Sequence, residues 1–190
     1  IKTWRESYDL FVIQGWLFNH EGVRRGEEFV TRKITKNVAF IKYCLNNGHE
    51  IKPLSVGNIY AQRDWSDAED FMDGVWKMLN NSSPKEYVLS SGKKNTVKKF
   101  ITEAFNVVGI DGNWENETSD NVNEKFYTVV DGKKILLVQI DPKFYRPAEV
   151  DTLLGDSTLA KKELGWVPKS TFEDLVKKMV LYDYNELINS

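Results

Sequence analysis

The chain is almost without cysteine: Cys44 is its single thiol, so no disulfide bond within the chain can hold the fold together. We therefore expect a cytoplasmic protein in which Cys44 is a small core residue of a helix. No apolar run approaches the roughly 20 residues that a membrane-spanning helix requires, and no signal-peptide pattern opens the sequence. These absences exclude a disulfide-rich secreted domain and predict that no membrane is involved.

A strong charge of one sign is also missing, because 26 lysines and arginines face 28 aspartates and glutamates, which leaves a net charge of -2. A dedicated nucleic-acid-binding domain is normally basic, so we expect no nucleic-acid partner. The basic residues nevertheless gather locally, and such a cluster suits a small anionic ligand better than a polymer. Its members are Arg24, Arg25, Arg32, Lys33 and Lys36.

Catalytic and cofactor-binding motifs are absent from the sequence as well. It contains no G-x-G-x-x-G turn, no Walker loop, no Cys/His metal spacing and no G-x-S-x-G. No tyrosine is followed four residues later by lysine; Tyr8 and Tyr43, for example, are followed by Val12 and Asn47. We therefore expect neither catalytic residues nor metal ligands in this chain. The helical pattern at Ile1 has no capping residue, so we expect an upstream segment to precede it.

What is present is an alternation of strand and helix patterns, which predicts an α/β protein. An opening helix should end near Asp9. Residues 10–18 then form a nearly continuous apolar run, typical of a strand covered on both faces in a parallel sheet. Asp64 or Ser66 is the expected N-cap of a later helix. Further patterns predict short strands at 54–59 and 87–90 and helices at 29–45, 96–108, 157–164 and 171–187.

Turn residues refine this expectation. Asp131-Gly132 predicts a hairpin between strands at 126–130 and 135–140. The acidic, asparagine-rich residues 111–124 are expected to form a solvated loop. Only the strand at 10–18 has the pattern of a large doubly wound sheet, so the rest should form a small mixed lobe beside it.

Two segments place positive charges where an anionic ligand is expected. Residues 19–27 follow the predicted buried strand, and in open α/β sheets ligands bind at the carboxyl ends of strands. Arg24 and Arg25 lie there between glycines, and a planar guanidinium suits phosphate, although a solvated surface loop shows a similar pattern. The second segment, residues 29–34, opens a helix, and helix N-termini attract anions. Lys33 could add a charge there or simply face the solvent.

Two further segments combine an arginine with a carboxylate. In residues 63–65, Arg-Asp-Trp, the charges equally fit a local ion pair and the tryptophan fits the core. In residues 144–150, Arg146 could clamp a diphosphate, while Glu149 could accept hydrogen bonds from two ribose hydroxyls. Each of these residues, taken singly, fits a structural role as well as a functional one.

Taken together, these segments resemble the GDP-mannose 4,6-dehydratases, a family of the extended short-chain dehydrogenase/reductase superfamily. The similarity is collinear over essentially the whole sequence. There are two departures: Gly22-Val23 replaces the usual Ser-Pro, and Ser66-Asp67 replaces the usual Gly-His. The segments that carry the resemblance are residues 17–21, 24–27, 29–35, 57–58, 63–65, 144–150, 153–156 and 164–166.

The resemblance implies a fold and a reaction. The fold would be the C-terminal part of an NAD(P)-binding Rossmann-type domain, with a small mixed α/β substrate-binding lobe. Residues 1–28 would end the Rossmann domain, and residues 29–190 would form mostly the nucleotide-sugar-binding lobe, with 54–80 returning to the Rossmann domain. The complete enzyme, a homo-oligomer (dimer or tetramer), would use NADP to convert GDP-mannose to GDP-4-keto-6-deoxymannose, a precursor of GDP-fucose, by internal hydride transfer.

The resemblance also assigns roles to residues. The family's Gly-rich turn, its Ser/Thr and Glu, and its Tyr-x-x-x-Lys pair would all lie upstream of Ile1, so this chain alone should be inactive. His20 and Arg25 correspond to NADP contacts. Alternatives are a fragment of a related GDP-sugar reductase or epimerase and a non-catalytic GDP-sugar-binding protein. The residues that correspond to GDP-mannose contacts are Asn19, Val30, Lys33, Arg63, Arg146 and Glu149.

Overall fold

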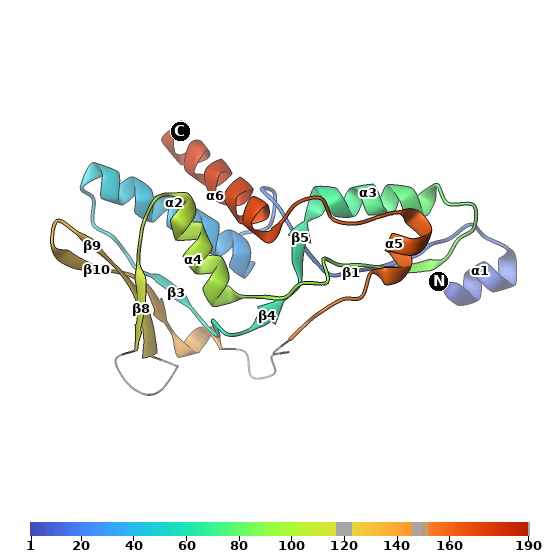
Figure 1. Cartoon of the computed structure of the whole chain (residues 1–190), viewed down its shortest axis with the longest axis horizontal. Coiled ribbons are helices and arrows are strands. Elements are labelled where there is room, and N and C mark those ends of the chain that lie inside the picture. Colours follow the sequence, from blue (N-terminus) through green and yellow to red (C-terminus); the bar gives the residue numbers. More distant parts are fainter. Residues whose placement is uncertain (117–122, 146–149, 151, 190) are drawn as a thin grey trace. The chain divides into compact units, whose positions relative to one another are not determined.

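The structure, a computed structural model, describes residues 1–116, 123–145, 150 and 152–189. The chain forms two compact units, each assembled from separate stretches of sequence (Figure 1). Strands and helices occur in both, which confirms the predicted α/β class. Unit 1 comprises Ile1–Gly22, Arg63–Asn95 and Thr152–Leu175, and unit 2 comprises Val23–Gln62, Thr96–Asp151 and Val176–Ser190.

Unit 1 is built on parallel strand pairs. Strand β1 pairs with β6, with Gly15 opposite Tyr87, and β2 pairs with β5, with His20 opposite Ser66. Parallel pairing is therefore not confined to residues 10–18. The sequence does not predict β2 and β5, because strands of three residues carry too little periodicity to be recognised. The elements of unit 1 are α1 (Lys2–Tyr8), β1 (Gln14–Leu17), β2 (Asn19–Glu21), β5 (Trp65–Asp67), α3 (Ala68–Leu79), β6 (Glu86–Leu89) and α5 (Thr158–Leu164).

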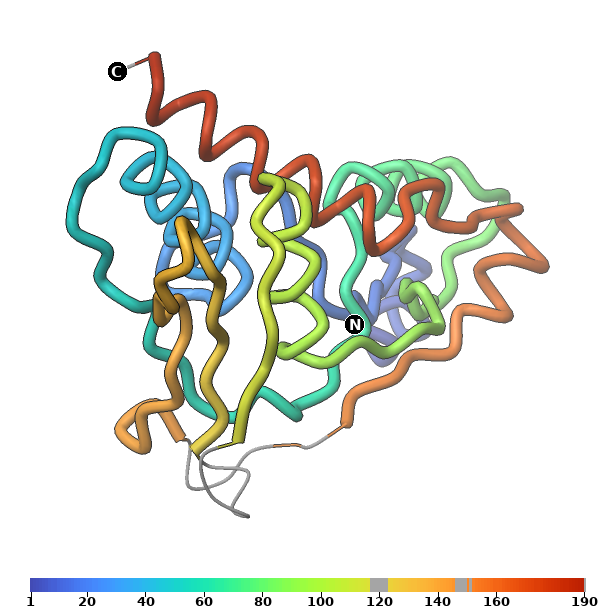
Figure 2. The backbone as a smooth tube through the Cα atoms, turned by 60° about the vertical axis from the view of Figure 1, so that its left-hand side comes forward, coloured from blue at the N-terminus to red at the C-terminus, as the bar shows by residue number. Residues whose placement is uncertain are grey.

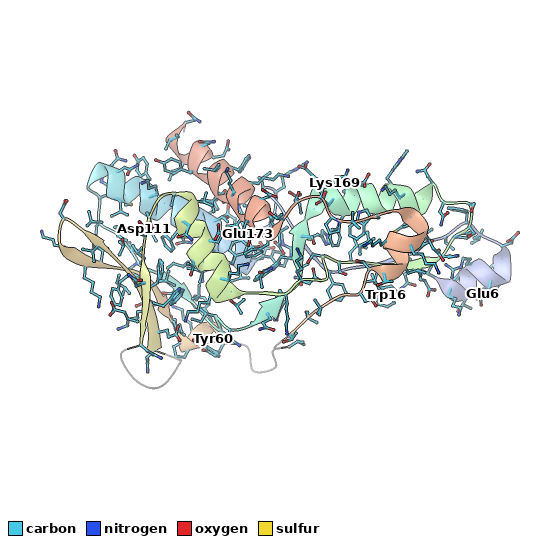
Figure 3. All side chains as sticks on the ribbon, in the orientation of Figure 1. Glu6, Trp16, Tyr60, Asp111, Lys169 and Glu173 are labelled. Atoms are coloured by element: carbon cyan, nitrogen blue, oxygen red, sulfur yellow. The ribbon has the colours of Figure 1, made fainter. Side chains whose placement is uncertain are left out.

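Strand β1 is shorter and more exposed than predicted. It covers only part of residues 10–18, and its two central residues are exposed. Trp16, labelled in Figure 3, is 58% exposed, while Leu10 and Phe11 are 45% and 51% exposed. Among the described residues β1 pairs only with β6, so its other edge has no paired strand. The predicted strand covered on both faces is therefore not found.

The core of unit 1 forms around Trp166, which is fully buried. Its indole Nε1 donates a hydrogen bond to the backbone carbonyl of Asp70 at 2.8 Å. Its ring meets Phe71 edge-on, with the ring centroids 5.6 Å apart. The other buried members of this cluster are Met78, Tyr87, Leu89 and Ala160. The cluster joins α3, β6 and α5 into one packed body.

The N-terminus of α3 is capped by Asp67, not by Asp64 or Ser66 as predicted. The Asp67 side chain accepts a hydrogen bond from the backbone N–H of Glu69 at 2.9 Å. Because this bond satisfies one of the helix's free N–H groups, Asp67→Ala should lower the free energy of unfolding by about 1 kcal/mol.

Ser66→Ala is the matched control for that prediction. The buried Ser66 hydroxyl makes no hydrogen bond in the described part of the chain, so its removal should change stability little. Urea denaturation of the two variants measures the difference. Equal losses of stability would contradict the assignment of Asp67 as the cap.

Unit 2 is built on a mixed sheet with the strand order β3-β10-β9-β8. Strands β3 and β10 run parallel, and the other neighbours run antiparallel. Helices α2 and α4 lie side by side next to this sheet (Figure 2). The elements of unit 2 are α2 (Val30–Asn47), β3 (Leu54–Val56), α4 (Val97–Val107), β8 (Asn113–Asn116), β9 (Glu124–Val130), β10 (Lys133–Ile140), the 3-10 helix η2 (Pro142–Phe144) and most of α6 (Phe172–Ile188). Two further short strands, β4 (Gln62–Arg63) and β7 (Asn95–Thr96), pair with each other.

The hairpin between β9 and β10 confirms the prediction from its turn residues. Asp131 and Gly132 both have positive φ angles, 51° and 74°. A two-residue type I′ turn requires this conformation at both central positions, and Asp-Gly adopts it readily.

The solvated loop predicted for residues 111–124 is wrong in part, because residues 113–116 form strand β8 against β9. Trp114 holds this strand in place. Its Nε1 donates to the Thr102 hydroxyl at 2.9 Å, and its ring packs on Phe126 with the centroids 5.1 Å apart. One packed aromatic side chain therefore outweighs the polar residues around it, and composition alone does not reveal that.

Helix α2 confirms its predicted apolar stripe. Ile34, Val38 and Ile41 are buried, and the helix ends at Gly48, whose φ of 67° is left-handed. Cys44 is 1% exposed, and burial raises the pKa of its thiol, as expected for a core cysteine. Within the ranges described, no helix is both long and apolar enough to cross a membrane.

Candidate nucleotide-binding residues

Three predicted ligand-binding residues lie close together along the β2–β5 pair of unit 1. Asn19 lies opposite Trp65 in the register of these parallel strands, and His20 is the next residue of β2. Arg63 precedes β5 by two residues. In this parallel register Asn19 and Arg63 both lie near the amino ends of the two strands, while Asn19 and His20, as consecutive strand residues, point to opposite faces of the pair.

The imidazole of His20 is held in one orientation. Its Nδ1 lies 2.8 Å from the carbonyl oxygen of Phe18, and a carbonyl can only accept, so Nδ1 carries a proton. The ring also stacks on Phe71, with centroids 5.2 Å apart and an interplanar angle of 22°. In the neutral form, Nε2 is therefore left with a lone pair that can accept a hydrogen bond from a ligand.

Lys33 in the first turn of α2 points at the protein, not at the solvent. Its ammonium donates to the carbonyl of Ser55 in β3 at 2.7 Å and lies 3.6 Å from the centroid of the Phe144 ring. Burial lowers the pKa of Lys33, the nearby charge of Lys143 lowers it further, and Asp141 opposes both. The interpretation in which Lys33 simply faces the solvent is therefore wrong.

The segment after β3 explains why Phe144 lies beside Lys33. A Cβ atom at Gly57 would lie 2.4 Å from the carbonyl oxygen of Phe144, so no other residue fits there without a backbone shift. The backbone N–H of Asp141 also donates to the carbonyl of Val56 at 2.8 Å. Gly57 thus lets η2 approach β3 closely enough to place an aromatic ring next to the ammonium.

Arg25 and Val30 lie near the N-terminus of α2, at the end opposite Gly48. The Arg25 guanidinium stacks on the Phe29 ring, 3.5 Å from its centroid, which holds the charge near the helix N-terminus. Val30 is the first residue of α2, and Phe29 before it provides no side-chain cap. The positive end of the helix dipole and two positive charges, Arg25 and Lys33, make this end of α2 suitable for an anion.

The predicted residues do not all fall in one unit. Asn19, His20 and Arg63 belong to unit 1, and Arg25, Val30 and Lys33 belong to unit 2. Arg146 and Glu149 lie outside the described residues. Where the structure is described, no cluster of His, Cys, Asp and Glu side chains is found that could hold a metal ion.

Sequence reasoning missed two residues that organise these sites. Phe144 lies within the candidate segment 144–150, but nothing in the sequence indicates that its ring lies next to Lys33. Asp64 is completely buried, and both of its carboxylate oxygens accept hydrogen bonds from other parts of unit 1. The sequence feature that could have indicated Asp64 is its place between Arg63 and Trp65, but that pattern equally fits a local ion pair.

Comparison with known proteins identifies the family. The family model for GDP-mannose 4,6 dehydratase matches residues 1–179. The chain is 40% identical over 183 residues to GDP-mannose 4,6 dehydratase from Drosophila melanogaster, and the matched stretch covers 96% of this chain and 44% of the relative. It is 41% identical over 189 residues to GDP-mannose 4,6-dehydratase from Vibrio cholerae serotype O1, and here the matched stretch covers 97% of this chain and 49% of the relative. The chain thus spans about half the length of the curated relatives it matches.

Solved structures share the fold at lower identity. RMD from Pseudomonas aeruginosa, in complex with NADPH, matches with a TM-score of 0.73 at 17% identity, over 96% of this chain and 51% of its own. dTDP-glucose 4,6-dehydratase from Bacillus anthracis, in complex with NAD, matches with a TM-score of 0.67 at 16% identity, over 97% of this chain and 48% of its own. The fold therefore corresponds to about half of an extended short-chain dehydrogenase/reductase structure, as predicted. The family match over residues 1–179, with about 40% identity to these relatives, shows that the chain belongs to the GDP-mannose 4,6-dehydratase family.

Proposed function

We propose that this chain is the nucleotide-sugar-binding part of a GDP-mannose 4,6-dehydratase that also contacts NADP. The family match over residues 1–179 is the observation that carries the proposal. The complete enzyme would oxidise C4 of the mannose, eliminate water across C5 and C6, and return the hydride to C6. The product is GDP-4-keto-6-deoxymannose.

The residues assigned to NADP, His20 and Arg25, fit that cofactor chemically. His20 offers an acceptor at Nε2 for an amide N–H such as that of a nicotinamide carboxamide. Arg25 offers a permanent positive charge, held against Phe29, that can pair with phosphate. When bound, NADP accepts the hydride and returns it. The chain's own contribution is to bind and orient the cofactor.

The residues assigned to GDP-mannose fit an anionic nucleotide. Lys33 supplies a partly buried ammonium at the helix end where Val30 begins α2. Asn19 and Arg63 supply further hydrogen-bond donors beside β5. Two more residues are assigned to the same ligand, although they lie outside the described residues: Arg146 and Glu149.

The domain roles and the assembly are further parts of this proposal. Residues 1–28 would end the cofactor-binding domain, and residues 29–190 would form mostly the nucleotide-sugar lobe, with 54–80 returning to the first. These functional parts follow the family resemblance, and their bounds differ from those of the two compact units. The complete enzyme would be a cytoplasmic homo-oligomer.

The proposal is tested by incubating GDP-mannose and NADP with the complete polypeptide that contains residues 1–190, and separately with residues 1–190 alone. We expect the complete polypeptide to form the 4-keto product with loss of one water, detected by mass spectrometry. Residues 1–190 alone should form none, because they contain no Tyr-x-x-x-Lys pair and no Gly-rich dinucleotide turn.

Two outcomes would contradict the proposal. Product formed by residues 1–190 alone would show that the catalytic groups lie within this chain. A complete polypeptide that leaves GDP-mannose unchanged but reduces a GDP-4-keto sugar would instead identify a reductase.

A further inference from the structure

Asp64 is a buried carboxylate whose hydrogen bonds join three distant segments of unit 1. Its side chain is 0% exposed. One oxygen accepts from the Ser91 backbone N–H at 2.8 Å and from the Ser91 hydroxyl at 2.5 Å. The other accepts from the N–H of Gly92 at 2.9 Å and of Gly155 at 3.3 Å. Hydrogen bonds thus join Asp64, the residue after Arg63, to the turn after β6 and to the segment before α5.

Three of the four groups that point at the carboxylate are backbone N–H donors, and the two carboxylate oxygens accept from all of them. An asparagine side chain has the same shape, but its NH2 group would face either the two Ser91 donors or the N–H groups of Gly92 and Gly155. At least one buried backbone N–H would then lose its partner. Asp64 is therefore not replaceable by asparagine without loosening the junction.

The junction also reaches the backbone that orients His20. A Cβ atom at Gly155 would lie 2.3 Å from Cβ of Ser90 and 2.8 Å from the ring of Phe18, so this glycine is packed without spare room. The N–H of Phe18 donates to the carbonyl of Leu89 at 3.0 Å, and the carbonyl of Phe18 accepts from His20. Movement of Gly155 would therefore disturb Phe18, whose carbonyl fixes the imidazole.

We infer that Asp64 is a positioning residue for ligand binding: through Ser91, Gly92 and Gly155 it holds Arg63 and the Phe18–His20 backbone in their binding geometry. The inference rests on the proposed function, which places Arg63 on GDP-mannose and His20 on NADP. Asp64 itself is buried and touches neither ligand. Its contribution is to keep two ligand-binding side chains at fixed positions, and a misplacement of about 1 Å can reduce the rate roughly a hundredfold.

Asp70 provides a matched control within the same unit. It is also buried, and one of its oxygens accepts from the backbone N–H groups of Lys169 and Ser170 at 3.0 Å and 2.9 Å. Like Asp64, it ties distant segments together through backbone hydrogen bonds. None of those segments contains a predicted ligand-binding residue. Asp70→Asn should therefore affect stability without affecting ligand affinity.

The experiment compares Asp64→Asn, Asp70→Asn and wild type in the complete polypeptide, with the Tm measured by calorimetry and the Kd for GDP-mannose by titration. Both variants should lower the Tm. Only Asp64→Asn should raise the Kd, by roughly tenfold or more. Ser91→Ala, which removes a single donor to Asp64, is a milder variant in case Asp64→Asn does not fold, and it should raise the Kd by roughly threefold to tenfold.

A double-mutant cycle with Arg63→Ala separates positioning from general destabilisation. If Asp64 acts through Arg63, Asp64→Asn should add little to the loss that Arg63→Ala already causes in GDP-mannose affinity. Unchanged affinity in Asp64→Asn, equal losses in Asp64→Asn and Asp70→Asn, or fully additive losses with Arg63→Ala would each overturn the inference. A wild-type protein that does not bind GDP-mannose would instead overturn the proposed function, so the two failures are distinguishable.

Discussion

Asp183→Ala should lower the free energy of unfolding by about 3 to 5 kcal/mol, one of the two largest effects we expect. The Asp183 carboxylate on α6 accepts from Nη2 of Arg32 at 2.8 Å and from the Thr35 hydroxyl at 2.6 Å, both on α2. The side chains of Arg32 and Asp183 are only 11% and 3% exposed. Without the carboxylate, a charged guanidinium stays buried and unpaired. That uncompensated charge, more than the lost contact, causes the loss.

Two features of Arg32 and Asp183 make the pair sensitive. In the described residues, Nε and Nη1 of Arg32 are buried without a hydrogen-bond partner, and Asp183 is the carboxylate that pairs directly with this guanidinium. Burial raises the pKa of Asp183, while the Thr35 hydrogen bond and the Arg32 charge act in the opposite direction. Burial prevails and the pKa of Asp183 stays raised, so the pairing offsets only part of the penalty of burial. Replacing both partners, Arg32→Met with Asp183→Leu, should recover most of the stability.

Urea denaturation of the two single variants and the double variant measures this coupling. Glu27→Ala is the control, because Glu27, in the turn before α2, pairs with Lys36 of α2 at the surface. Its side chain is 71% exposed, so its removal should shift the denaturation midpoint far less. If Asp183→Ala lowers the free energy of unfolding no more than Glu27→Ala does, the buried Arg32 charge does not need Asp183 for stability.

Lys33→Met in the complete polypeptide should weaken GDP binding by about tenfold to a hundredfold. We place the ammonium on the nucleotide, and the loss of one charge-assisted hydrogen bond has an effect of this size. Methionine keeps most of the side chain's length and removes the ammonium, together with its hydrogen bond to Ser55 and its contact with the Phe144 ring. Isothermal titration of GDP into both proteins measures the change.

The pH dependence of GDP binding gives a second readout for Lys33. Burial lowers the pKa of the free ammonium below its ordinary value, and a bound anion would raise it again. Between these two pKa values, GDP binding should take up a proton, which appears as a binding enthalpy that depends on the buffer. The Lys33→Met variant should lose this proton uptake.

Lys143→Met is the matched control for Lys33. Lys143 lies beside the same Phe144 ring, 4.9 Å from its centroid, but it is 67% exposed and pairs with Asp141. We expect GDP affinity close to wild type in this variant. If both lysine variants weaken GDP equally, the effect is a general loss of positive charge, and Lys33 has no specific place in the site.

The parts of the fold that were predicted correctly depend on neighbours in the sequence. The Asp131-Gly132 hairpin follows from a turn that these two residues adopt readily, and the stripe of α2 follows from apolar spacing. The cap of α3 was assigned wrongly, because several polar residues precede that helix and only the backbone geometry selects Asp67. Strand β8 was missed because its stability comes from Trp114, whose contacts are made with a helix and another strand.

By itself, the sequence determined the α/β class, most helices, one hairpin and the resemblance to a dehydratase family, because residue type and spacing carry that information. Only the tertiary structure decided which charged groups meet. Lys33 donates to Ser55, 22 residues away, and Asp64 accepts from Gly155, 91 residues away. A hydrogen bond forms only when donor and acceptor approach to about 3 Å, and for partners so distant in sequence the packing of whole elements sets that approach.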